Sequence, residues 1–142
     1  GSGTQILAEK IHQGCVYTGY DIGKMNVENI YLDLNKKFEL NEFYDVVVLL
    51  GVLEYLEDPI STVKRLRMYC NEVIISYVSA KNLHSSNIKI REGIGVKNHL
   101  TKIDLADCLR ESDLAIINDF TIWDNPNDEH LMYHLTWPPH TE

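Results

Sequence analysis

Apolar residues occur along the chain in short blocks that alternate between helical and strand-like spacing. Residues 5–12 place Ile6, Leu7 and Ile11 on one stripe, which predicts a helix. The run at 44–50 is continuous rather than alternating, as in a parallel strand that is covered on both faces. The blocks that predict strands are 15–20, 30–32, 44–50, 73–78, 114–123 and 131–137.

Two positions carry signals for the start of a helix. Asp58 is an N-cap residue followed by Pro59, which favours the first helical position. Thr101 and Asp104 have the spacing of a capping box and predict a helix that runs to about Arg110. Residues 80–98 are polar, with glycines near their end, and predict a long loop.

The order of these elements predicts an α/β fold. Strands alternate with helices up to residue 110, which indicates a Rossmann-like, mostly parallel sheet. The last two strands are joined by a turn at 125–128 and predict a C-terminal antiparallel hairpin. The chain has 142 residues and shows no internal repeat or linker, so we expect residues 1–142 to form a single domain.

Charge and composition narrow the classes of partner. Lys and Arg number 13 against 21 Asp and Glu, a net charge of −8, which argues against nucleic acid and anionic membranes as main partners. No apolar run reaches the roughly 20 residues of a membrane span. The three cysteines include no CxxC pair, which favours small core side chains in a reducing cytoplasm over disulfides. His130 and His134 share a strand face without converging on an ion, and we predict no metal.

Candidate ligand-binding residues follow the predicted strands. In open parallel sheets, ligands bind at the carboxyl ends of the strands. Gly1 and Gly3 precede a helix, where small residues let backbone N–H groups approach a ligand. Asp21 ends a strand and can accept hydrogen bonds from both hydroxyls of a ribose, or it is a solvated turn residue. Asp33 ends the next strand, where an Asx turn is the alternative, and Gly51 follows the third.

Five short motifs carry a resemblance to a known family. In the same order and at similar spacing, they are similar to motifs of the class I S-adenosylmethionine-dependent methyltransferases, in the branch that acts on small molecules. The resemblance covers nearly the whole chain. The motifs are residues 1–8 (GSGTQILA), 17–22 (YTGYDI), 32–34 (LDL), 43–47 (FYDVV) and 51–59 (GVLEYLEDP).

The resemblance implies S-adenosylmethionine as the cofactor and assigns parts of it to residues. Gly1 and Gly3 would pass close to its methionine part, and Asp21 would hold the hydroxyls of the ribose. Asp33 and Leu34 would border the adenine, and Gly51 would leave room under the sulfonium. The implied cofactor-binding residues are Gly1, Gly3, Asp21, Ile22, Asp33, Leu34 and Gly51.

Methyl transfer requires an acceptor held in line with the methyl group. A base is needed only if the acceptor must lose a proton. Glu54, Tyr55 and His99 are the catalytic candidates at the same rim. The plainer alternatives are that Glu54 solvates a helix start and that His99 is a loop histidine. We expect a small-molecule acceptor, such as a sugar or another metabolite, in contact with residues 80–98.

The chain departs from the family pattern in three places. The family has a central strand before the first glycine motif, which the sequence lacks; a fragment of a longer protein, a cloning remnant at residues 1–3 and a degenerate domain are the open explanations. Gln5 replaces the third glycine of the motif. Residues 22–29 are too few for the usual helix, so an uncovered apolar face is expected to invite a partner or a homodimer.

Three functions compete on this sequence. The first is methyl transfer to a small molecule. The second is a catalytically silent methyltransferase-like domain that acts as a binding or scaffold module, which the departures from the family pattern favour. The third is a nicotinamide-dependent oxidoreductase, which also uses glycines and an acidic residue after the second strand. Residues 54–59 (EYLEDP) and the terminal hairpin argue against the third.

Overall fold

The computed structural model describes residues 5–23 and 28–138. The chain forms two compact units, Gly1–Glu39 and Leu40–Glu142, which we call unit 1 and unit 2. The described part of unit 1 holds a 3-10 turn, η1 (Ile6–Glu9), and two short parallel strands, β1 (Tyr20–Asp21) and β2 (Ile30–Tyr31).

Two predictions for unit 1 were too long. The helix predicted at 5–12 is the single turn η1, and the strand predicted at 15–20 is reduced to β1. Among the described residues, β1 pairs only with β2, which is itself two residues long, so most of the predicted strand has no ladder to join. Val16, near the start of the predicted strand, is 95% exposed and adds no apolar burial to it.

Unit 2 contains a four-stranded sheet in the order β3-β4-β6-β5. The strands β3 (Tyr44–Leu49) and β4 (Cys70–Ala80) are parallel. The strands β5 (Ala115–Asp124) and β6 (Asp128–Thr136) form an antiparallel hairpin, and β6 pairs antiparallel with β4. The α/β fold with parallel pairing and a terminal hairpin is therefore confirmed, and the hairpin joins the parallel pair through its second strand, β6.

The two predicted helix starts are also confirmed. In α1 (Pro59–Leu66), the Asp58 Oδ1 atom accepts a hydrogen bond of 3.0 Å from the Ser61 backbone N–H. That hydrogen bond lowers the pKa of the Asp58 carboxyl. In α3 (Lys102–Glu111), Thr101 and Asp104 make both hydrogen bonds of the capping box. These local hydrogen bonds satisfy N–H groups that the first helical turn leaves without a partner.

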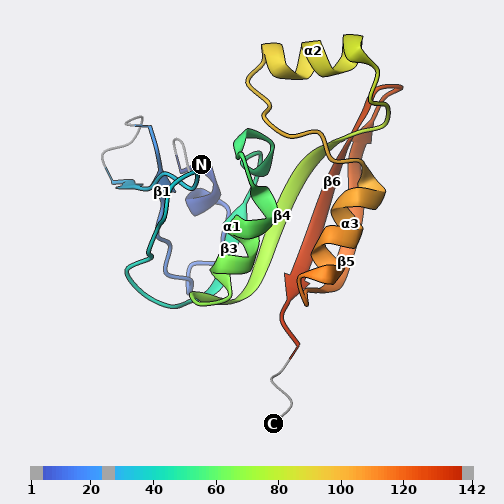
Figure 1. Cartoon of the computed structure of the whole chain (residues 1–142). Coiled ribbons are helices and arrows are strands. Elements are labelled where there is room, and N and C mark those ends of the chain that lie inside the picture. The colour runs from blue at the N-terminus through green and yellow to red at the C-terminus, as the bar shows by residue number, and fades with distance from the viewer. Residues whose placement is uncertain (1–4, 24–27, 139–142) are drawn as a thin grey trace. The chain divides into compact units, whose positions relative to one another are not determined.

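The core of unit 2 lies on one face of its sheet. Alternate residues of β4, from Val73 through Ile75 to Tyr77, are fully buried. Each is registered against a buried residue of β6. Figure 1 shows α1 and α3 on the same side of this sheet. Leu105 and Leu109 of α3 are fully buried and close the core on that side.

Two predictions for unit 2 were wrong. Of the residues of β3, only Leu49 is buried, and Val46 is 40% exposed. The reason is that β3 is an edge strand of its sheet in the described part of the chain, with α1 and α3 on one face only. The predicted loop at 80–98 contains a second helix, α2 (Ser85–Gly93), which lies beyond the end of β4 (Figure 1).

Candidate functional site

The candidate site in unit 2 begins where β4 continues beyond its parallel neighbour. The ladder between β3 and β4 ends at Leu49 and Ile75, but β4 runs on to Ala80. Backbone N–H and C=O groups on that edge of β4 then need partners other than a strand. Side chains and loop backbone from the segments before and after β4 supply them.

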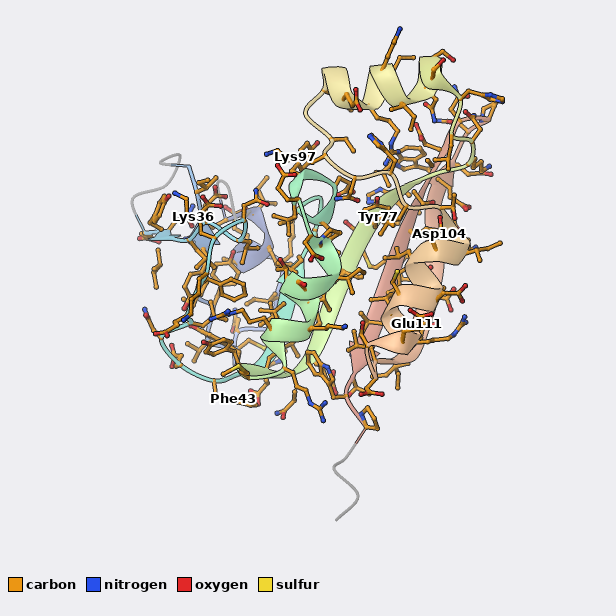
Figure 2. All side chains as sticks on the ribbon, viewed as in Figure 1. Lys36, Phe43, Tyr77, Lys97, Asp104 and Glu111 are labelled. Atoms are coloured by element: carbon orange, nitrogen blue, oxygen red, sulfur yellow. The ribbon has the colours of Figure 1, made fainter. Side chains whose placement is uncertain are left out.

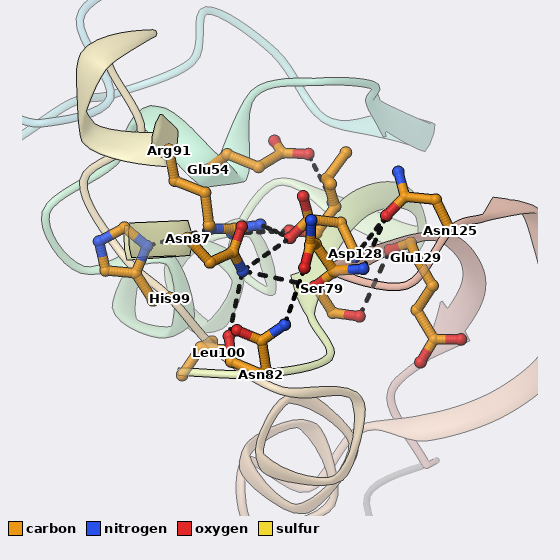
Figure 3. Close-up of polar contacts among 12 residues, drawn as sticks. Glu54, Ser79, Asn82, Asn87, Arg91, His99, Leu100, Asn125, Asp128 and Glu129 are labelled. Carbon is orange, nitrogen blue, oxygen red and sulfur yellow. Dashed lines mark hydrogen bonds and ion pairs between the residues drawn. The ribbon is translucent and has the colours of Figure 1, made fainter. Parts of the chain in front are cut away.

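Glu54 and Arg91 satisfy the two backbone groups of Val78 on this edge (Figure 3). The Glu54 Oε1 atom accepts a hydrogen bond of 2.7 Å from the Val78 N–H, and the Arg91 Nη2 atom donates one of 2.8 Å to the Val78 carbonyl oxygen. Two residues further on, the Ala80 N–H donates to the Leu100 carbonyl at 3.1 Å. Both charged side chains are only 3% exposed, so their first role is to complete the edge of the sheet.

Arg91 also ties α2 to the hairpin and to the segment after α2. Its Nη1 atom pairs with Asp128 Oδ1 at 2.9 Å, and its Nε atom donates to His99 Nδ1 at 3.1 Å. The other ring nitrogen of His99 lies 3.6 Å from Glu92 Oε1. The His99 side chain is 19% exposed and therefore reaches the surface. Arg91 thus holds Asp128, His99 and Val78 together at the carboxyl end of β4.

Asn98 and Tyr77 join the segment after α2 to the segment after β3 and to β4. The Asn98 Nδ2 atom donates hydrogen bonds of 2.8 Å to the carbonyl oxygens of Leu53 and Leu56. The Tyr77 hydroxyl donates to Asn98 Oδ1 and accepts a hydrogen bond from the Leu100 N–H at 3.0 Å. Burial raises the pKa of Tyr77 to about 12, so the hydroxyl keeps its proton and remains a donor. Figure 2 labels Tyr77 in the view of Figure 1.

The segment after β3 presents open space and an exposed aromatic ring. Gly51 has a φ of 62°, and its N–H donates to Ser76 Oγ at 2.9 Å. A Cβ atom at this glycine would meet nothing within 4 Å. Tyr55 is 44% exposed, and its ring lies 3.7 Å from the place of a Cβ on Gly95. Unit 2 therefore brings the predicted residues Gly51, Glu54, Tyr55 and His99 to the carboxyl ends of β3 and β4.

The predicted ribose and adenine residues lie in unit 1, at the ends of its two strands. Asp21 Oδ1 accepts a hydrogen bond of 2.8 Å from the Gly23 N–H. Asp33 Oδ1 accepts one of 3.0 Å from the Asn35 N–H, and its other oxygen lies 3.6 Å from Lys36 Nζ. Both carboxylates thus make Asx-type turns, which fix their orientation. Ile22 is exposed and Leu34 is half-buried, whereas Gly1 and Gly3 lie outside the described residues.

Gln5, which replaces a glycine of the family motif, retains the backbone conformation of a glycine. Its φ of 61° and ψ of 34° are left-handed, a region that favours glycine. The side chain is held by a hydrogen bond of 2.6 Å from Gln5 Nε2 to Asn29 Oδ1. The substitution has therefore changed the side chain at this position while the glycine-type turn into η1 persists.

Three further properties hold for the part of the chain that the structure describes. No group of three His, Cys, Asp or Glu residues could hold a metal ion there. No helix in this part of the chain is long and apolar enough to cross a membrane. The cysteines are free thiols: Cys15 is exposed, Cys108 is partly buried, and burial raises the pKa of Cys70 to about 12.

Sequence reasoning did not find Arg91, Asn98 or Asp128. Arg91 lies within the predicted loop, and its partners are separated from it by 8, 13 and 37 residues. The available signal was weak: an arginine and an asparagine close to a candidate histidine, within the segment expected to contact the acceptor.

The parallel pair followed by an antiparallel hairpin, with the candidate residues at the carboxyl ends of the strands, defines a Rossmann-like α/β protein. Residues 1–119 match the family model described as a methyltransferase domain, and the chain belongs to this family. The family predicted from the five motifs is thereby confirmed. No curated protein sequence matches the chain.

Solved structures show the same fold at low sequence identity. A magnesium protoporphyrin IX methyltransferase from Synechocystis PCC 6803, with SAH bound, is 18% identical over 78% of this chain and 51% of that chain, with a TM-score of 0.55. The [4+2]-cyclase SpnF is 9% identical over 97% and 72%, with a TM-score of 0.72. OxaC in complex with sinefungin and meleagrin is 15% identical over 96% and 41%, with a TM-score of 0.64. The chain thus spans about half the length of the Synechocystis enzyme.

Proposed function

We propose that the chain binds S-adenosylmethionine and takes part in the transfer of its methyl group to a small-molecule acceptor. The observation that carries the proposal is the arrangement at Gly51. In a chain of the methyltransferase family, a left-handed glycine with open space around its missing side chain stands at the end of the parallel pair, where this class of sheet binds ligands.

The residues present fit such a cofactor. Asp21 and Asp33 end parallel strands, and their turns orient carboxylate oxygens that can accept hydrogen bonds from a ribose and from an adenine amine. Ile22 and Leu34 would add apolar contacts beside them. Gly1 and Gly3, which lie outside the described residues, are assigned to the methionine part by the family motif, and Gly51 would leave room under the sulfonium. When bound, the cofactor supplies a methyl group on a positively charged sulfur that needs no further activation.

We assign the acceptor side to the rim of unit 2. Tyr55 and His99 reach the surface there and would contact the acceptor, holding it in line with the methyl group. Glu54 is buried and acts through Val78, whose position it fixes. α2 extends this rim, so the acceptor would lie against residues 80–98. The class of acceptor that we propose is a sugar or another metabolite. We further propose that the chain acts as one domain and that it acts in the cytoplasm.

The first experiment is a calorimetric titration of the chain with S-adenosylhomocysteine. Saturable binding is expected. Replacing Asp21 by Ala should weaken it by about 1–3 kcal/mol, because the hydroxyls of the ribose lose their acceptor. Asp107→Ala is the matched control, because Asp107 is an exposed carboxylate whose pairing is with Arg110 on the same helix. The proposal is contradicted if the folded wild-type chain shows no binding, and the Asp21 assignment fails if both variants bind equally.

A second function is favoured by one finding. SpnF, which covers nearly all of this chain, carries the name of a cyclase, so the same fold exists in a protein whose name describes a different chemistry. The corresponding hypothesis is that this chain keeps the fold or the cofactor pocket and transfers no methyl group. Incubation with radiolabelled S-adenosylmethionine and pooled small metabolites separates the two: labelled product supports methyl transfer, and binding without any labelled product supports the alternative.

A further inference from the structure

Arg91 determines which nitrogen of His99 carries the proton. A guanidinium group only donates hydrogen bonds, and it stays charged at every pH at which the protein folds. Because Arg91 Nε approaches His99 Nδ1 at 3.1 Å, Nδ1 must be the acceptor. The neutral imidazole then has its hydrogen on Nε2. A proton on Nδ1 would instead place two donors opposite each other.

Arg91 has no freedom to turn away from His99. Its Nη2 atom is bound to the Val78 carbonyl and its Nη1 atom to Asp128, and the side chain is 3% exposed. Rotating the guanidinium would leave a buried charge and a buried carbonyl without partners. The Val78 carbonyl lies on the edge of β4 that has no strand partner among the described residues, and Arg91 must stay in place to bind it. This requirement fixes the orientation of Arg91 and, with it, the tautomer of His99.

The other ring nitrogen of His99, Nε2, faces an oxygen atom. Nε2 lies 3.6 Å from Glu92 Oε1, and the Glu92 side chain is 60% exposed. A contact made by an exposed side chain is weak, so a ligand can displace it. A carboxylate, carbonyl or hydroxyl oxygen of the ligand could then take the place of the Glu92 oxygen. A histidine that serves as a base needs a lone pair on that same nitrogen, and the contact with Arg91 removes it.

We propose that Arg91 is a positioning residue that holds His99 as an Nε2–H donor, and that His99 binds an oxygen atom of the ligand rather than taking a proton from it. The part that concerns the ligand rests on the proposed function. The part that concerns the tautomer does not, because it holds in the chain without cofactor or acceptor.

Long-range ¹H–¹⁵N NMR of the whole ¹⁵N-labelled chain tests the tautomer. The His99 signals are assigned by their loss in His99→Gln. The expected result is an unprotonated Nδ1 and a protonated Nε2. Arg91→Lys should yield a mixture of tautomers, because one ammonium group cannot reach Val78, Asp128 and His99 together. Lys89→Gln, on the exposed face of the same helix, should leave the wild-type pattern.

Two results of this experiment would overturn the proposal: a proton on Nδ1 in the wild type, or an unchanged tautomer in a folded Arg91→Lys chain. If that variant fails to fold, the wild-type tautomer alone decides. Acetate serves as a carboxylate probe for the ligand part, with Glu92→Gln to remove the competing charge. A saturable shift of the His99 Nε2 signal is expected, and its absence overturns this part. Titration with S-adenosylhomocysteine separately reports on the proposed function.

Discussion

Unit 1 and unit 2 differ in how much apolar surface their described residues bury. Unit 1 carries Asp21 and Asp33, but its described residues include one buried apolar side chain, Phe38, and two strands of two residues. Unit 2 holds the rest of the buried apolar side chains, the four-stranded sheet and three helices of the described chain. Because burial of apolar surface is the main favourable term in folding, unit 2 must supply most of the stability.

This difference shows that a segment can carry the residues of a family motif and still bury little apolar surface. The motif positions of unit 1 lie in turns and make hydrogen bonds such as those of Gln5 and Asp21, with little apolar burial. Segments with few buried contacts open at low free energy, and ligand-binding segments are commonly drawn from them. The following predictions test the comparison, in order of decreasing effect.

The largest contrast is expected from matched truncations of leucine. Leu135 of β6 is fully buried, and Leu135→Ala should lower the free energy of unfolding by about 2–5 kcal/mol through lost burial and the cavity that remains. Leu32 of unit 1 is half-buried, and Leu32→Ala should cost less than about 1 kcal/mol. Urea denaturation followed by circular dichroism measures both, and equal losses would refute the assignment of stability to unit 2.

A smaller contrast within unit 2 comes from replacing an amide by a carboxylate. Asn98→Asp keeps the oxygen that Tyr77 reaches but removes the donors to Leu53 and Leu56, so we expect a loss of about 1–3 kcal/mol. Asn125→Asp is the control, because its side-chain oxygen only accepts hydrogen bonds from backbone N–H groups. Thermal unfolding at neutral pH should separate the two variants. Similar melting temperatures would show that the Asn98 donors contribute little.

Alkaline pH should destabilise unit 2 through its buried hydroxyl and thiol. The folded-state pKa values of Tyr77 and Cys70 are raised to about 12 from ordinary values of 10.0 and 9.0. The unfolded chain therefore loses these protons first, so the contribution to stability is complete below about pH 9 and falls as pH rises towards 12. Urea midpoints at a series of pH values should decline less steeply in Tyr77→Phe. Tyr31→Phe, at an exposed position of unit 1, should follow the wild type; an equal slope in all three would count against burial as the cause.

The smallest effect concerns two residues other than glycine that have a left-handed backbone in the described part of the chain, one in each unit. Asp113 has a φ of 59° after α3, and Gln5 has a φ of 61° before η1. Asp113→Gly should raise the free energy of unfolding by about 0.5 kcal/mol, because glycine adopts this conformation without steric cost. Gln5→Gly should give no net gain, because it also removes the hydrogen bond to Asn29. Urea denaturation measures the free energy of unfolding of both variants. A larger increase for Gln5→Gly than for Asp113→Gly would show that the hydrogen bond to Asn29 contributes little.

The sequence predicted those parts of the fold whose causes are local. Asp58 before Pro59, and Thr101 with Asp104, begin helices through hydrogen bonds to backbone N–H groups within three residues. The second strand of the hairpin, β6, carries buried apolar residues at alternate positions, Leu131, Tyr133 and Leu135. The sequence did not predict α2, because its buried side chains, Asn87 and Arg91, are polar and no apolar stripe marks its inner face.

The candidate site was predictable only in part, for a related reason. Gly51, Glu54 and Tyr55 could be placed at the rim because they follow a strand directly, and the end of a strand is readable from sequence. Whether Glu54 is exposed or buried depends on Val78, 24 residues away, and on how far β4 extends beyond β3. Such a difference in strand length is a property of the assembled sheet.

The way α2 is attached has a consequence for how the chain can change. Only Asn87 and Arg91 of this helix are buried, and both are fixed by hydrogen bonds rather than by apolar packing. The remaining surface of α2, including the exposed Ile90, contributes little to the core. Its residues can therefore be exchanged at little risk to folding. A helix attached in this way is a segment that selection, or an engineer, could vary while the sheet remains the same; under the proposed function, such variation would change the choice of acceptor.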